Sequence, residues 1–209
     1  MENFVKGYPK RSYAKGEIIL QQGDIPTCAY VVKSGFVKVY NLTAEGEERP
    51  ILFDVTYEIF PIGWVFHKIA ASYFFYEAFT DCELYMVPRH DYIEFLNSNP
   101  GAMFRALDYY VERHIGQQLR VHALEQSRAY DKLLYTLEFL TRRFGVSCSD
   151  YRKEISLPLT QQDIANFIGL TRETVAIELN KLKRDKVIAY QNQIYSVDMS
   201  LLERILQER

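Results

Sequence analysis

The stretch Thr160–Lys186, TQQDIANFIGLTRETVAIELNKLKRDK, decides the fold of the C-terminal part of the chain. Its pattern predicts two short helices joined by a tight turn. Thr160 is suited to cap the first helix, because its side-chain oxygen can accept from the backbone N–H groups that open a helix. Gly169 tolerates the positive φ at which many helices end, and Thr171 then caps the second helix.

Each of the two predicted helices has one apolar face. On the second helix Val175, Leu179 and Leu182 recur at spacings of four and three, which places them on one side. The small Ala165 on the first helix allows the two helices to cross closely. The expected inward positions of the first helix and of the turn are Ile164, Phe167, Ile168 and Leu170.

The opposite face of the second helix is polar and is suited to the major groove of DNA. Arginine can form two hydrogen bonds with guanine, glutamate can accept one from cytosine, and asparagine can pair with adenine. An ordinary helical hairpin with a solvated charged face is the alternative. The candidate DNA-binding residues are Thr160, Gln161, Thr171, Arg172, Glu173, Thr174, Ala176, Ile177, Asn180, Lys181 and Arg184. Phosphate contacts are expected mainly from Lys181, Lys183, Arg184 and Lys186.

The composition is that of an ordinary soluble globular protein. The chain has 209 residues, of which 48% are hydrophobic and 25% charged, and its formal net charge is −2. Residues 126–209 carry +2 and the remainder −4, an asymmetry that weakly favours a DNA-binding C-terminal part. Cys28, Cys82 and Cys148 are too far apart in the sequence for a disulfide framework or a cysteine metal site. With no secretory start after Met1, a cytoplasmic location is expected.

The N-terminal half has the pattern of an antiparallel β-roll. Short segments of strand composition, bounded by glycine turns, are expected at residues 13–20, 28–40, 49–55 and 82–87. Val37 and Val39 alternate with Lys38, which indicates one buried face. Helices are expected at 100–125, 129–144 and 199–207, and a hairpin is expected at 187–197.

Two motifs resemble the Crp/Fnr family of bacterial transcription regulators. Lys15–Asp24 (KGEIILQQGD) followed by Tyr30–Tyr40 (YVVKSGFVKVY) is similar to that family's effector-domain roll. The segment TQQDIA followed by GLTRETV resembles its winged helix-turn-helix. The resemblance extends from about Tyr13 to Leu201. It implies an α+β fold with a β-roll effector domain at 1–98, a dimerisation helix at 99–125 and a winged helix-turn-helix domain at 126–209.

The resemblance also implies partners. The long helix is expected to pair with its twin in a homodimer, double-stranded DNA is the expected ligand, and RNA polymerase is an expected partner. The alternative for the apolar stripe on that helix is packing against its own roll. The stripe consists of Phe104, Leu107, Val111, Ile115 and Leu119.

The sequence departs from the cyclic-nucleotide members of the family in the phosphate cassette. Those members carry Gly-Glu-Leu followed by Arg-Ser/Thr-Ala, where Glu holds the ribose and Arg neutralises the phosphate. Here the glycine is Gly63, but Trp64 stands at the place of the glutamate, and no arginine occurs between Arg49 and Arg89. A buried phosphate without a cation is costly, so we expect no cyclic AMP binding in the usual mode.

Aromatic residues replace the cassette: Tyr57, Phe60, Trp64, Phe66, Tyr73, Phe74, Phe75 and Tyr76. Two hypotheses stay open at this stage, a pocket for an apolar or aromatic effector and a self-filled roll with no effector. Candidate pocket residues are Gly63, Trp64, His67, Tyr73 and Phe75, with Lys68 as a further polar anchor. No cysteine cluster for an iron–sulfur centre precedes the roll, and a haem would depend on His67. We expect no metal and no cofactor, because the histidines (His67, His90, His114 and His122) show no ligand spacing.

Three further questions concern function. Many members of the family have a second arginine where this chain has Ile177; an exposed Ile177 can contact a thymine methyl group, and a buried one would pack on the first helix. An enzyme of the cupin type needs clustered histidine and glutamate ligands, which the roll does not offer, so no enzymatic activity is expected. A DNA-binding protein of low specificity, with an architectural role, is the remaining alternative. Neither the operator nor the sign of regulation follows from the sequence.

Overall fold

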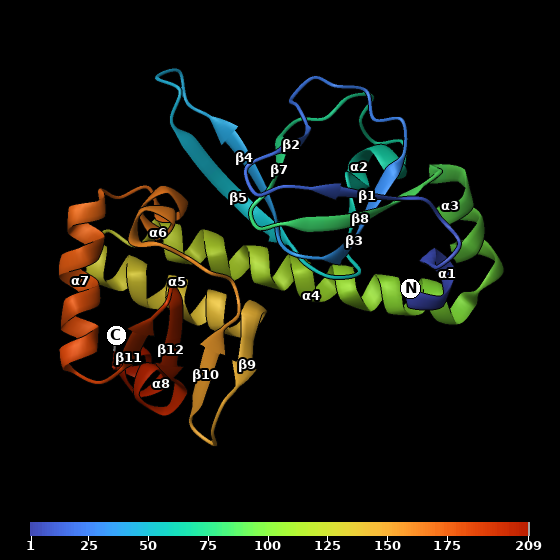
Figure 1. The fold of residues 1–209 in the computed structure, drawn as a ribbon. Coiled ribbons are helices and arrows are strands. Elements are labelled where there is room, and N and C mark those ends of the chain that lie inside the picture. Colours follow the sequence, from blue (N-terminus) through green and yellow to red (C-terminus); the bar gives the residue numbers. More distant parts are fainter. Residues whose placement is uncertain (209) are drawn as a thin grey trace. The chain divides into compact units, whose positions relative to one another are not determined.

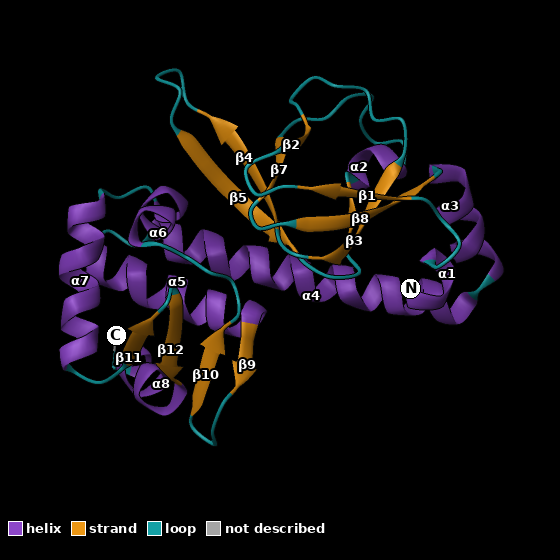
Figure 2. Ribbon diagram, in the orientation of Figure 1, coloured by secondary structure: helices purple, strands orange, loops and turns teal. Residues whose placement is uncertain are grey.

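The computed structural model describes residues 1–208 and contains two compact units, residues 1–108 and the remainder from Tyr109 onward. Figure 1 shows the course of the chain, and Figure 2 shows its helices and strands. The strands of the first unit are β1 (Lys10–Tyr13), β2 (Ile18–Leu20), β3 (Ala29–Ser34), β4 (Val37–Leu42), β5 (Glu48–Asp54), β6 (Ile59–Phe60), β7 (Phe75–Ala78) and β8 (Cys82–Val87). Its helices are α1 (Glu2–Val5), α2 (Ile62–Val65), α3 (Arg89–Ser98) and the start of α4 (Pro100–Glu125).

Two antiparallel sheets form the predicted roll. One has the strand order β1-β8-β3-β6 and the other the order β2-β7-β4-β5. Because successive side chains of a strand point to opposite faces, β3 contributes to two separate cores. Tyr30 and Val32 face the interior of the roll, whereas Ala29 and Val31 belong to the core beneath α1, α2 and α3.

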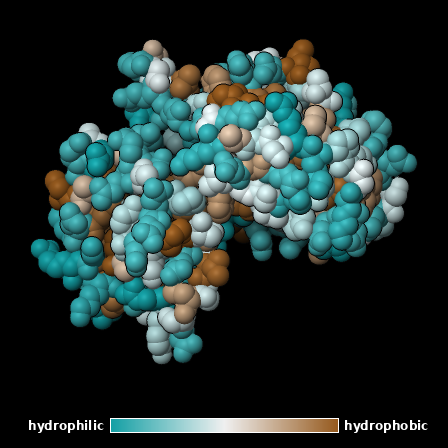
Figure 3. Space-filling view, in the orientation of Figure 1, coloured by the Kyte–Doolittle hydropathy of each residue, from teal (hydrophilic) through white to brown (hydrophobic). Residues whose placement is uncertain are grey.

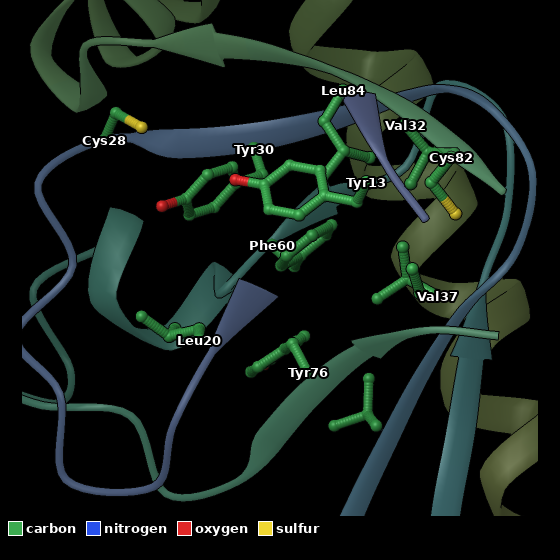
Figure 4. Close-up of a cluster of buried hydrophobic side chains, with 12 residues drawn as sticks. Tyr13, Leu20, Cys28, Tyr30, Val32, Val37, Phe60, Tyr76, Cys82 and Leu84 are labelled. Carbon is green, nitrogen blue, oxygen red and sulfur yellow. The ribbon is translucent and has the colours of Figure 1, made fainter. Parts of the chain in front are cut away.

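The interior of the roll is occupied by stacked aromatic rings (Figure 4). The ring centroids of Tyr30 and Phe60 lie 5.3 Å apart, and those of Phe60 and Tyr76 lie 4.8 Å apart with nearly parallel planes. Cys28 and Cys82 lie at opposite ends of this cluster, and both are free thiols.

The expectation of one strand over residues 13–20 is wrong. The chain turns at Gly16, whose φ is +84°, and Glu17 donates a backbone hydrogen bond to Ala14 across the turn at 2.9 Å. Of this stretch, only Tyr13 belongs to β1 and Ile18–Leu20 form β2, and these two strands pair in different sheets. The glycine was the visible signal for this break.

Strand β4 is buried on both faces, contrary to the alternating pattern expected from its sequence. Lys38 is 7% exposed, and its ammonium lies 2.5 Å from a Glu48 carboxylate oxygen and 3.0 Å from one of Glu77. The ammonium also lies 4.6 Å from the centroid of the Tyr40 ring. Paired in this way, a lysine can occupy a buried position that the sequence pattern assigns to solvent.

The second unit contains the rest of α4, then α5 (Ala129–Phe144), α6 (Gln161–Ile168), α7 (Arg172–Arg184) and α8 (Met199–Gln207). Its strands are β9 (Gly145–Ser147), β10 (Arg152–Ile155), β11 (Ile188–Gln191) and β12 (Ile194–Asp198), which form one antiparallel sheet in the order β11-β12-β10-β9. The bounds expected for α4, α5 and α8 are confirmed. Within residues 1–208, no helix is long and apolar enough to cross a membrane.

Gly35, in the turn between β3 and β4, is predicted to be intolerant of a side chain. Its φ is +86°, and a Cβ there would lie 2.3 Å from the Asp81 carbonyl oxygen. Gly46 also has a positive φ, +82°, but faces open space, so it is the matched control. Gly46→Ala should lower the free energy of unfolding by about 1–2 kcal/mol, the cost of the left-handed backbone. Gly35→Ala should cost at least about 1 kcal/mol more, because neighbouring backbone must move. Urea unfolding of both variants checks this, and equal losses would contradict it.

Candidate nucleic-acid interface

The first helix of the predicted pair, α6, begins with a complete capping box. The Thr160 hydroxyl accepts from the Asp163 backbone N–H at 3.1 Å, and the Asp163 carboxylate accepts from the Thr160 N–H at 2.8 Å. The helix ends at Gly169, which has φ +69° and ψ +38°, the left-handed conformation expected of it. Both ends of α6 are therefore fixed by local interactions that could be predicted from the sequence.

The second helix, α7, is held from one side. Val175 and Leu182 are fully buried and Leu179 nearly so, and these residues face α6 and α5. At its start the Thr171 hydroxyl accepts from the Thr174 N–H at 3.2 Å. Leu170, expected in the core, is only partly buried in the turn.

The opposite side of α7 faces solvent. Arg172, Glu173 and Asn180 are exposed, and Ile177 is 57% exposed. The alternative in which Ile177 packs against α6 is therefore wrong. Thr174 and Ala176 are partly buried at the edges of this face, as are Thr160 and Gln161 at the start of α6. In Figure 3 the surface over α7 is mostly hydrophilic on the side shown.

Basic side chains lie toward the C-terminal end of α7. Lys181, Lys183, Arg184 and Lys186 are all exposed. Lys181 forms an ion pair with Glu178 at 2.8 Å, whereas the Arg184 side chain lies 3.8 Å from the Asp185 carboxylate. The Arg184–Asp185 pair is exposed on both sides, so it is weak in water and can exchange for a phosphate contact.

The hairpin β11–β12 lies beside the start of α6. Its turn has positive φ at Asn192 and Gln193, and the Gln193 carbonyl accepts from the Leu159 N–H at 3.1 Å. This bond places the polar tip of the hairpin next to the cap residue Thr160. The hairpin continues into a sheet with β10 and β9, which the sequence analysis missed. The Ser149-Asp150 pair between residues 145 and 155 was the only turn signal for those two strands.

The apolar stripe on α4 is largely exposed within the chain. Phe104 is 70% exposed and Ile115 is 51% exposed; Leu107 and Val111 are similar, and Leu119 is partly buried. Four of the five stripe residues are therefore largely exposed. Four large apolar side chains along one helix face are an unusual solvent surface for a monomer.

The structure does not gather the candidate effector residues around one space. Trp64 is buried in α2, in the core beneath the helices, and the Arg89 guanidinium lies over its ring at 4.5 Å. Phe75 is on β7 and stacks on Tyr40 at 5.2 Å. Tyr73 is 61% exposed, and His67 and Lys68 are exposed after α2, where His67 has a positive φ. Gly63 is in α2, close to Ile69.

Among the described residues, no cluster of three or more histidine, cysteine or carboxylate side chains could hold a metal ion. Burial raises the pKa of the Cys28 and Cys82 thiols inside the roll, so the thiol form is favoured over the reactive thiolate. The polar face of α7 is the candidate DNA-binding surface.

Two family models match the sequence in the order of the two units. Residues 10–99 match the cyclic nucleotide-binding domain, and residues 132–205 match the Crp-like helix-turn-helix domain. The nitrogen fixation regulation protein FixK of Rhizobium meliloti is 29% identical over 182 residues, covering 85% of this chain and 77% of that protein. The fumarate nitrate reduction regulatory protein of Klebsiella oxytoca is 25% identical over 197 residues, covering 91% and 75%.

The fold is also similar to that of a solved structure. The structure of FixK2 from Bradyrhizobium japonicum superposes with a TM-score of 0.77 at 19% identity, covering 94% of this chain and 96% of that one. A β-roll followed by a long helix and a winged helix-turn-helix defines a DNA-binding transcription regulator. The chain belongs to the Crp/Fnr family of such regulators.

Proposed function

We propose that the protein acts as a homodimer that binds a near-palindromic operator through the exposed face of α7. The observation that carries the proposal is the one-sided burial of this helix, which leaves Arg172 and Glu173 in solvent while Val175 and Leu182 are buried. In a symmetric dimer the two recognition helices would enter successive major grooves, ~34 Å apart. The DNA target of such a regulator lies in the bacterial cytoplasm, and RNA polymerase stays a partner predicted from the family resemblance alone.

Base recognition is assigned to the first turns of α7. Arg172 can fork onto guanine, and Glu173 can accept from cytosine N4. Ile177 offers only methyl and methylene groups at a 57% exposed position, which suits the C5-methyl group of thymine. The lysines and arginine toward the end of the helix supply phosphate contacts, which orient the protein without reading sequence.

The exposed stripe of α4 supports the dimer. A second copy of the same helix is the natural cover for it, because a two-fold axis brings identical residues together. The two faces therefore act together: the apolar face of α4 forms the dimer, and the dimer sets the distance between the two α7 helices that contact DNA.

The roll, in this proposal, does not take a cyclic nucleotide in the usual mode. Trp64 stands at the place of the ribose-binding glutamate and is buried beneath Arg89. The stack of Tyr30, Phe60 and Tyr76 occupies the interior in which a nucleotide would lie. These contacts favour the self-filled roll over the effector pocket.

The operator can be identified by selection from random duplexes. We expect a near-palindrome with an A·T pair at the position facing Ile177. Replacing Ile177 with Arg should change the preferred base pair at that position to G·C. Binding to the G·C duplex should then be favoured over binding to the A·T duplex by about 1–3 kcal/mol, because a guanidinium can pair with guanine. Lys183→Ala is the control and should weaken all duplexes alike and reduce the salt dependence of binding. A G·C requirement in the wild-type operator at that position would contradict the assignment of Ile177.

The dimer can be tested with two equally exposed residues of α4. Ile115 lies on the stripe at 51% exposure, and Val121 lies off it at 53%. Ile115→Glu should convert the dimer to a monomer in sedimentation equilibrium, because two carboxylates would be buried across the two-fold axis. Val121→Glu should leave the dimer intact. The same effect of both substitutions would show that the stripe is not the interface.

Cyclic AMP should fail to raise the melting temperature of the protein. A ligand that binds only the folded state at 100 times its dissociation constant stabilises it by ~2.7 kcal/mol, which a thermal-shift experiment detects. The expected result is no shift at millimolar cyclic AMP. A rise of several degrees would contradict the self-filled roll.

A further inference from the structure

Arg120 forms two contacts with a single residue of the helix-turn-helix. It lies near the end of α4, where its Nη2 atom donates a hydrogen bond to the Phe167 carbonyl oxygen at 3.2 Å. Its guanidinium carbon also lies 4.2 Å from the centroid of the Phe167 ring. Burial lowers the pKa of Arg120 to about 10, so the group is still charged at neutral pH. The side chain thus brings a positive charge into a partly buried site.

Phe167 is at the end of α6, where such a charge is favourable. The last four carbonyl groups of a helix lack partners within the helix, and the helix dipole makes that end negative. The Ala165 carbonyl is used by the turn, since it accepts from the backbone of Gly169 and Leu170. Arg120 donates to the carbonyl of Phe167, two residues after Ala165. It therefore acts as a C-terminal cap of α6 that is provided by another helix.

The Phe167 ring connects this cap to α5. It stacks on the Phe139 ring with centroids 6.1 Å apart and planes inclined by 18°. Phe139 in turn faces Gly116 of α4, where an added Cβ would lie 3.6 Å from the ring. Gly116 and Arg120 are four residues apart and therefore share one face of α4. This face of α4 thus holds α5 and the end of α6 together.

The same contact lies a few residues from the recognition helix. Only Ile168, Gly169, Leu170 and Thr171 separate Phe167 from Arg172, and Gly169 is fixed in the left-handed turn. A shift of the end of α6 relative to α4 would therefore move the start of α7. The reach of a hydrogen bond leaves little room for such a shift.

We propose that Arg120 is a positioning residue for DNA recognition, which fixes the α6–α7 pair to the helix that carries the dimer stripe. The inference rests on the proposed function, since it assumes that α4 pairs with a second copy and that α7 reads bases. Ile115 and Leu119 of the stripe immediately precede Arg120 on α4. Through this side chain, the way in which the two α4 helices pair determines the distance between the two recognition helices.

The chemistry of the contact requires a guanidinium. Lysine can donate to the carbonyl, but it has no plane to lie against the phenylalanine ring. Methionine can fill the same space with an apolar chain and removes both the charge and the donor. Arg120→Met and Arg120→Lys therefore separate packing, hydrogen bonding and stacking. Arg142→Lys, at an exposed position on α5 that pairs with Glu138, is the matched control.

The experiment measures discrimination. Fluorescence anisotropy at one salt concentration compares the duplex that the wild-type dimer selects from a random pool with a scrambled duplex of the same composition. Arg120→Met should reduce the ratio of specific to non-specific affinity roughly tenfold, as expected for the loss of a hydrogen bond from a charged group. Non-specific affinity and the dimer dissociation constant should stay at the wild-type values. Arg120→Lys should fall between the two, and Arg142→Lys should match the wild type.

A role in folding alone gives another pattern, because it lowers specific and non-specific binding in parallel as the folded fraction falls. That pattern in both Arg120 variants, or an unchanged ratio in both, overturns the inference. If the Met variant does not fold, the Lys variant decides by the same criterion. If the wild type and both Arg120 variants prefer the selected duplex over the scrambled one equally, the inference about Arg120 is wrong but the proposed function is not. A wild type that enriches no sequence overturns both.

Discussion

The one-sided packing of α7 is the constraint on which the rest of the second unit depends. A 13-residue helix has too little internal stability to stand alone in water, so it must be held by tertiary contacts. Those contacts come from Val175, Leu179 and Leu182, all on one side. The other side of the helix stays exposed to solvent. The capping box of α6 and the left-handed Gly169 then fix the angle at which that side is presented.

In our proposal, the roll has the fold of the cyclic nucleotide-binding domain without its usual way of binding the nucleotide. Its two sheets and its turns match the cyclic nucleotide-binding domain, yet its interior contains a ladder of aromatic rings. Stacked rings of this kind stabilise a core by apolar burial and by ring geometry. Buried Lys38, paired with Glu48 and Glu77, contributes a second fixed point on β4.

Local chemistry explains which parts of the structure could be predicted from the sequence. Thr160, Gly169 and Thr171 mark helix ends with side-chain or backbone preferences, and each occupies the predicted place. The strand break at Gly16 is also marked locally, by the glycine between Lys15 and Glu17. Strands β9 and β10 carried little signal because they are short and polar, and their pairing with β12 is a long-range event.

In the candidate site, too, local features could be predicted from the sequence and long-range contacts could not. The exposure of Arg172 and Glu173 follows from helical periodicity, so the sequence could predict it. The contact between Arg120 and Phe167 joins residues 47 positions apart, and no periodicity relates them. The grouping of aromatic residues into one effector pocket failed to anticipate that Trp64 and Tyr76 lie in different cores, on opposite faces of a sheet. Sequence proximity was a poor guide there because Trp64 lies in helix α2 and Tyr76 in strand β7, and the two elements face different cores.

The central claim is that two copies of the exposed α7 face read one duplex together. Hydroxyl-radical footprinting on the selected operator tests it most directly, because the method reports which sugars each protein copy covers. The account predicts two equivalent protected patches per strand, centred about 10 base pairs apart, with two chains bound per duplex. A single protected patch, with one chain bound per duplex, would contradict it.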